Sequence, residues 1–141
     1  MGFHAFFGCD SVGRFAKKGK ATLFSFFKEA DEDVLLAVEN CCETLEMLSK
    51  FVCKIYSPVG IPITSLKKLR WTLFCKSMGA SENLPPTDAA LEQHLMRANF
   101  QAYIWHQCDI PNQIQLDPTE HGWKLLAGKS LTYHQKSKSC P

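Results

Sequence analysis

The sequence contains no run of about 18 apolar residues, the length that a membrane-spanning helix requires. It also lacks the marks of a secretory signal, because its apolar start has neither a basic leader nor a small-residue cleavage site. No Cys-x-x-Cys pair occurs among the seven cysteines, whose odd number and irregular spacing favour reduced core thiols over disulfides or a zinc site. We therefore expect an intracellular protein, in the nucleus or the cytoplasm, that is not secreted and binds no membrane.

An excess of charge of one sign is also missing, since the formal net charge is only +2. A total this small does not by itself favour a polyanionic partner. The charges are nevertheless segregated, because residues 31–49 carry six acids and no base, and residues 50–76 carry six bases and no acid. Part of this pattern complements a helix dipole, with Glu46 in the first turns and Lys54 in the last turn of one expected helix.

Long alternating strand patterns are absent as well, and Leu131-Thr132-Tyr133 is too short to count as a strand. Hydrophobic periodicity instead predicts helices. They are expected over about residues 20–30, from a cap at Asp31 or Asp33, over about 42–56, from a cap at Thr64 or Ser65 to about 78, and over about 87–107. We thus expect an all-α single domain of five or six helices at residues 1–126, followed by an irregular, disordered tail at 127–141.

The apolar residues of the expected helices mark the core. The longest helix begins at Pro85-Pro86-Thr87-Asp88 and carries a continuous apolar stripe, made of Leu91, Leu95, Ala98, Ala102 and Trp105. His94, beside this stripe, is expected to be partly buried with a hydrogen-bond partner.

The preceding helix combines an apolar face with a basic zone. Leu66, Leu69 and Leu73 are expected to face inward. Trp71 either joins them or lies beside Lys67, Lys68 and Arg70, where cations next to an aromatic ring are suited to phosphates and a stacked base. The alternative for this zone is a solvated helix face.

A basic turn lies near the start of the chain, between Gly8 and the helix expected from Lys20. It contains Arg14, Lys17, Lys18 and Gly19, without the GxxxxGK[ST] spacing of a P-loop. A glycine-containing turn that opens a helix offers backbone donors at the positive end of the helix dipole, and lysines beside it favour phosphate. Taken alone, the pattern is also compatible with a solvated basic turn.

The same region carries a resemblance to a known family. His4-Ala5-Phe6-Phe7-Gly8-Cys9-Asp10, followed by Lys18-Gly19-Lys20, resembles the HAxTGCDTTSxFxGKGK pattern of uncharacterised, transposable-element-associated proteins that occur in many copies in animal genomes. The similarity continues at Asn83-Leu84-Pro85-Pro86-Thr87, Ala89-Ala90-Leu91, His94, Arg97, Gln101-Ala102, Ile104-Trp105 and Gly122-Trp123-Lys124. It therefore spreads over most of the chain.

This pattern in turn resembles the Gly-x-Asp and helix-two-turn-helix segment of flap-endonuclease-like 5′-nucleases, which are relatives of PIN domains. The resemblance implies that Asp10 binds a catalytic Mg²⁺ or Mn²⁺ ion. It implies that the turn formed by Lys18, Gly19 and Lys20 contacts the backbone of a nucleic-acid duplex. The chain departs from the pattern at Lys17, which stands at the first hairpin glycine, and at Ser11-Val12, which replace a Thr-Thr pair.

Catalysis needs more carboxylates than this segment supplies. Two-metal cleavage requires several acids that converge on the ions, and none of the nine residues before Asp10 is acidic. We therefore expect a truncated, non-catalytic remnant of a nuclease-like protein, which needs no cofactor and binds a duplex through Lys17 to Lys20. The alternatives are a helical module that binds a protein or itself through Phe3, Phe6 and Phe7, and a relic without a selected function.

Overall fold

The computed structural model describes residues 2–9, 11–40, 45–58, 60–77, 81–126 and 130–133. Its α-helices are α1 (Gly2–Phe6), α2 (Lys20–Lys28), α3 (Glu32–Asn40), α4 (Leu45–Tyr56), α5 (Leu66–Lys76) and α6 (Asp88–His106). The short 3-10 helices are η1 (Ser81–Asn83) and η2 (Pro118–His121), and the strands are β1 (Trp123–Leu126) and β2 (Ser130–Tyr133). The prediction of an all-α fold with five or six helices is confirmed.

The helix starts follow the capping residues in the sequence. Thr87 caps α6, because its hydroxyl accepts a hydrogen bond of 3.2 Å from the backbone N–H of Ala90. Ser65 caps α5 in the same way, at 3.5 Å from the N–H of Lys68. Both caps confirm the expected helix starts.

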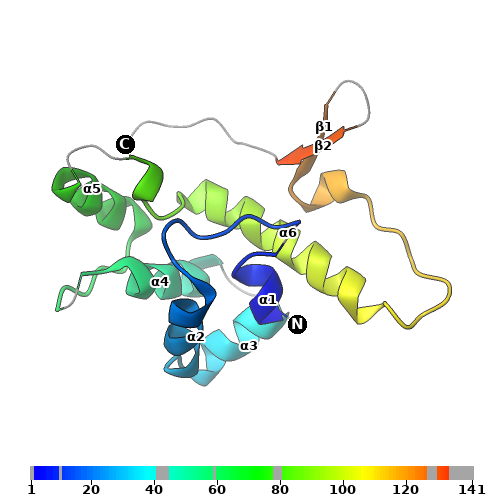
Figure 1. Cartoon of the computed structure of the whole chain (residues 1–141), viewed down its shortest axis with the longest axis horizontal. Helices are drawn as coiled ribbons and strands as arrows, with labels where there is room; N and C mark the ends of the chain where they lie inside the picture. Colours follow the sequence, from blue (N-terminus) through cyan, green and yellow to red (C-terminus); the bar gives the residue numbers. More distant parts are fainter. Residues whose placement is uncertain are drawn as a thin grey trace.

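Helix α6 is the longest element and runs across the molecule, with α1 and α4 packed against it (Figure 1). On its predicted apolar stripe, Leu91, Ala98 and Ala102 are buried, while Leu95 and Trp105 are half-buried. The stripe was therefore predicted correctly, and it organises the core around α6. None of the helices in the described ranges combines the length and the apolar character needed to cross a membrane.

The apolar start of the chain forms helix α1, which periodicity did not predict. Its Phe6 is fully buried, Phe7 is 1% exposed, and Phe3 is half-buried with its ring centroid 4.5 Å from that of Phe7. These rings belong to the main hydrophobic core. Contacts within the chain cover both rings, since Phe6 packs on Phe15 and His94, and Phe7 on Phe15 and Phe51. Binding of a partner through Phe3, Phe6 and Phe7 stays a prediction.

The second difference from the sequence prediction is a β-hairpin near the end of the chain. Strands β1 and β2 pair antiparallel, with Trp123 opposite Tyr133 and Leu125 opposite Leu131. Residues 130–133 thus form a strand and not part of an irregular tail. The remaining residues of the expected tail, 127–129 and 134–141, lie outside the described residues.

Candidate nucleic-acid interface

The basic turn forms an ordered loop, residues 13–20, which we call the basic loop. Phe15 anchors it to the core, with its ring centroid 5.4 Å from that of Phe6 and 5.0 Å from the His94 ring. A second anchor is the hydroxyl of Tyr56, which donates a 2.8 Å hydrogen bond to the backbone oxygen of Ala16. Burial raises the pKa of Tyr56 above its usual range, so this hydroxyl keeps its proton.

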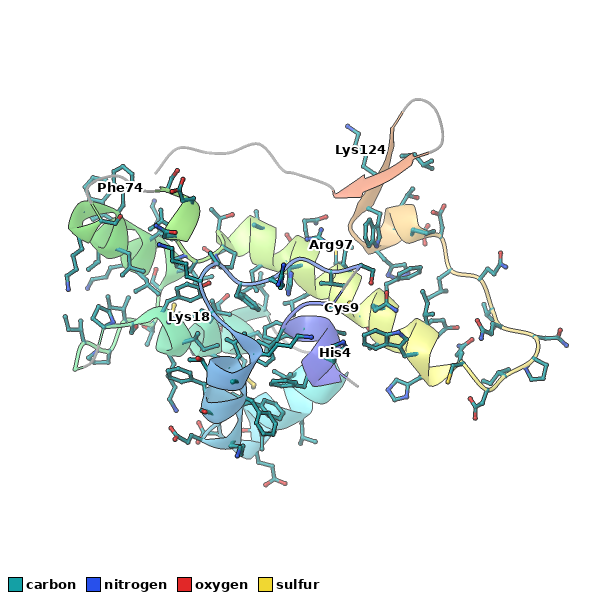
Figure 2. The ribbon with its side chains drawn as sticks, viewed as in Figure 1. His4, Cys9, Lys18, Phe74, Arg97 and Lys124 are labelled. Carbon is teal, nitrogen blue, oxygen red and sulfur yellow. The ribbon has the colours of Figure 1, made fainter. Side chains whose placement is uncertain are left out.

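The cations of the basic loop lie at the surface, fully or in part. Arg14, Lys17 and Lys20 are exposed, and Lys18 is half-buried. The ammonium nitrogen of Lys18 lies 5.0 Å from the centroid of the Tyr56 ring, a cation–π distance (Figure 2). Within the described part of the chain, none of the four cations forms an ion pair with a carboxylate. Their positive charge is therefore not neutralised by the neighbouring acids that the structure describes.

One lysine is held in place by a contact that the sequence did not predict. The ammonium nitrogen of Lys20 donates to Nδ1 of His4 over 2.8 Å, which requires an unprotonated Nδ1. The His4 ring in turn lies 5.4 Å from Trp105, a centroid distance that joins α1 to the end of α6. Lys20 is thus directed by a residue sixteen positions earlier in the chain.

The basic loop ends at the N-terminus of α2. Gly19 is the N-cap residue, with extended backbone angles of φ −76° and ψ 152°, and no side chain caps this end. The first-turn N–H groups therefore keep donor capacity toward the solvent, at the positive end of the helix dipole. This is the geometry that suits an anionic oxygen.

Asp10 lies outside the described residues, so the expected Mg²⁺ or Mn²⁺ contact stays a prediction. Among the described residues, no three His, Cys, Asp or Glu side chains gather closely enough to hold a metal ion.

Helix α5 carries a second basic surface. Lys67 and Lys68 are exposed, and Trp71 is 56% exposed rather than part of the core. Arg70 turns away from them and donates to the backbone oxygen of Pro85. Trp71 therefore lies outside the core, on the exposed side of α5 with the two lysines.

His94 packs against the basic loop through its ring contact with Phe15. Its Nε2 lies 2.6 Å from the backbone oxygen of Phe6, so it donates a hydrogen bond across the α1–α6 contact. Burial lowers the pKa of His94 to about 4, opposed by that hydrogen bond and reinforced by the charge of Arg97. The ring is therefore neutral at physiological pH. The expected hydrogen-bond partner is confirmed, while the side chain is buried rather than partly buried.

Comparisons with protein-family models, curated proteins and solved structures give no match to this chain. The fold defines the class, which is an all-α domain with one small hairpin among its described residues.

Proposed function

We propose that the protein binds the phosphate backbone of a nucleic-acid duplex through the basic loop and the N-terminus of α2. The observation that carries this proposal is the group of four cations on a core-anchored loop, without carboxylate partners in the described part of the chain. Phosphate contacts by lysine and arginine supply most of the affinity of sequence-independent binding.

Anchoring makes the loop a better binding surface than a flexible basic segment. The contacts of Phe15 with His94 and of Ala16 with Tyr56 fix the loop backbone before a ligand arrives. A fixed loop loses less conformational entropy on binding. The uncapped N–H groups after Gly19 add donors for the same phosphates.

The backbone of the loop is consistent with the nuclease-like resemblance. Lys17, which stands where the resembled pattern has a glycine, has φ 52°, in the left-handed region that glycine adopts readily. Gly8, from the Gly-x-Asp segment, has φ 105°, and a Cβ atom there would lie 2.6 Å from Cγ of Arg14. Both positions favour the glycines of the pattern, which supports a common origin for this loop.

The protein is proposed to bind a duplex without cleaving it. Phosphodiester cleavage by two metal ions needs several converging carboxylates, and the basic loop itself contains no acidic residue. We therefore propose a non-catalytic, duplex-binding relative of the transposon-associated nuclease-like proteins.

The test is a salt titration of duplex binding, measured by fluorescence anisotropy with a short labelled duplex. We expect the affinity to fall steeply between about 50 and 200 mM salt. The double variant Lys17→Ala/Lys20→Ala should bind more weakly, and the slope of log K against log salt should become shallower by about 2, or ~0.9 for each lost phosphate contact. Lys28→Ala/Lys54→Ala is the matched control, because it removes the same charge from exposed positions outside the basic loop.

Two outcomes would contradict the proposal. A flat salt response, or equal losses in the loop variant and the control, would show that the basic loop is not the duplex contact. Cleavage of the duplex in Mg²⁺ or Mn²⁺, abolished by Asp10→Ala, would overturn the non-catalytic part and leave the binding surface in place.

A further inference from the structure

The solvent-facing side of α5 combines basic residues with an exposed tryptophan. The helix has four basic residues and no acid, and its Leu66 and Leu69 are buried on the opposite side. Arg70 is engaged by the Pro85 carbonyl, which leaves Lys67, Lys68 and Lys76 as the exposed cations of the helix. Lys67 and Lys68 are the two that lie within one turn before Trp71.

Trp71 lies at the centre of that exposed side. Lys67 and Lys68 precede it by four and three residues, so both are its neighbours on the helix surface. Its ring is stacked on Phe74, with centroids 6.3 Å apart and planes inclined by only 24°. We call Lys67, Lys68, Trp71 and Phe74 the α5 face. It combines an exposed aromatic surface with two neighbouring lysines.

We infer that the α5 face binds single-stranded nucleic acid, with an unpaired base stacked on Trp71 and flanking phosphates contacted by Lys67 and Lys68. Positive charge without acids on the helix complements a polyanion, and every base offers a π-face of matching size. A duplex does not fit this site in the same way, because its interior base pairs hide their faces in the stack.

The stacked Phe74 adds to the argument for a base. It is half-buried and supports one side of the indole, which limits the orientations that Trp71 adopts. A rigid aromatic side chain loses little entropy when a second ring stacks on it. An acidic peptide would satisfy the lysines but would leave the aromatic surface without a ring partner.

This inference rests on the proposed function only for the class of ligand. The basic loop precedes α2, whereas the α5 face belongs to a different helix, and Figure 2 shows Lys18 and Phe74 on these separate elements. Single-strand binding and duplex binding therefore depend on different side chains, so the loss of one should leave the other unchanged.

The test measures the anisotropy of a fluorescently labelled oligothymidine and of the labelled duplex at about 50 mM salt. Trp71→Ala should raise the Kd for oligothymidine about tenfold or more, with duplex binding unchanged. Trp71→Phe should recover most of the affinity, since a smaller ring still stacks. Ile114→Ala is the matched control, because Ile114 is an apolar side chain that is 70% exposed outside α5.

The outcomes separate this inference from the proposed function. Duplex binding with no oligothymidine binding, or with oligothymidine binding that Trp71→Ala leaves unchanged, would overturn the α5 site and leave the basic loop intact. Oligothymidine binding that depends on Trp71, without duplex binding, would support the α5 site and contradict the proposed function. Tighter binding of an acidic peptide than of oligothymidine would assign the α5 face to a protein partner and overturn the inference. Because Trp71 is exposed, equal thermal unfolding of the variants should show that the fold is retained.

Discussion

Lys17 determines the shape of the basic loop through its backbone. Its φ of 52° lies in the left-handed region, which brings the Cβ atom of an L-residue close to the following carbonyl oxygen. The side chain is exposed, so no packing contact of a buried group offsets this cost. The position thus combines a charge suited to phosphate with a backbone suited to glycine.

This conflict leads to a prediction about stability. Lys17→Gly and Lys17→Ala remove the same charge, but only glycine relieves the left-handed backbone. We expect Lys17→Gly to have the larger free energy of unfolding, by about 1 kcal/mol, in urea titrations of both variants. Equal stabilities would mean that the loop rearranges around alanine without cost. Both variants should lose the same amount of duplex affinity, because they lose the same ammonium group.

The sequence predicted the basic residues of the site but not what positions them. Lysines and a glycine before a helix are a local pattern, which the sequence displays directly. The anchoring contacts join distant positions, such as Tyr56 to Ala16 over 40 residues, and no local pattern encodes them. The same limit applied to Trp71, because helical spacing placed it between two faces and only the packed structure shows which one it occupies.

At the scale of elements, length decided which predictions succeeded. Helices α2 to α6 span at least nine residues each, enough for an apolar periodicity and for a cap to be recognised. Helix α1 has five residues and strand β2 has four, too few for either signal. Such short elements are stabilised by tertiary contacts, here between α1 and α6 and between the two strands.

The segment formed by η2 and β1 docks on α6 through a close approach at Gly122. This residue has φ 81°, and a Cβ atom there would lie 2.8 Å from the backbone oxygen of Gln93 and 3.2 Å from Cγ of Arg97. Nη1 of Arg97 also donates a 3.0 Å hydrogen bond to the Gly122 carbonyl oxygen. Only glycine fits this position without moving the hairpin away from the helix.

We therefore predict that Gly122→Ala loosens the hairpin while the core helices persist. Hydrogen exchange at the β1 amides should become faster by about tenfold or more, since the left-handed backbone alone costs about 1–2 kcal/mol. Gly60→Ala is the matched control, because Gly60 has a similar φ of 80° but a Cβ atom there would meet no other atom within 4 Å. Unchanged exchange in the hairpin would contradict the proposed docking.

On the scale of the whole molecule, α1, α6 and the basic loop meet at one buried histidine. His94 belongs to α6, and its ring centroid lies 5.0 Å from that of Phe15 in the loop. Its Nε2 donates a hydrogen bond to the backbone oxygen of Phe6 in α1. The rings of Phe6 and Phe15 pack against it, and Arg97 is a nearby positive charge. A second positive charge at this point would oppose the packing of all three segments.

Stability should consequently fall in acid. The folded pKa of His94 is about 4, below the ordinary value of 6.5, so the unfolded chain binds the proton more tightly. The contribution of the neutral ring to the free energy of unfolding is complete above pH 6.5 and is lost as the pH falls toward 4, by about 3 kcal/mol in total.

Because carboxylates titrate in the same pH range, the effect of His94 is measured as the difference in stability between the wild type and His94→Gln, each unfolded in urea. The glutamine keeps a donor for the Phe6 carbonyl. The wild type should lose more stability than the variant between about pH 7 and pH 4.5. Exposed His106→Gln serves as the control and should follow the wild type. Parallel curves for the wild type and His94→Gln would show that the buried imidazole does not link the fold to pH.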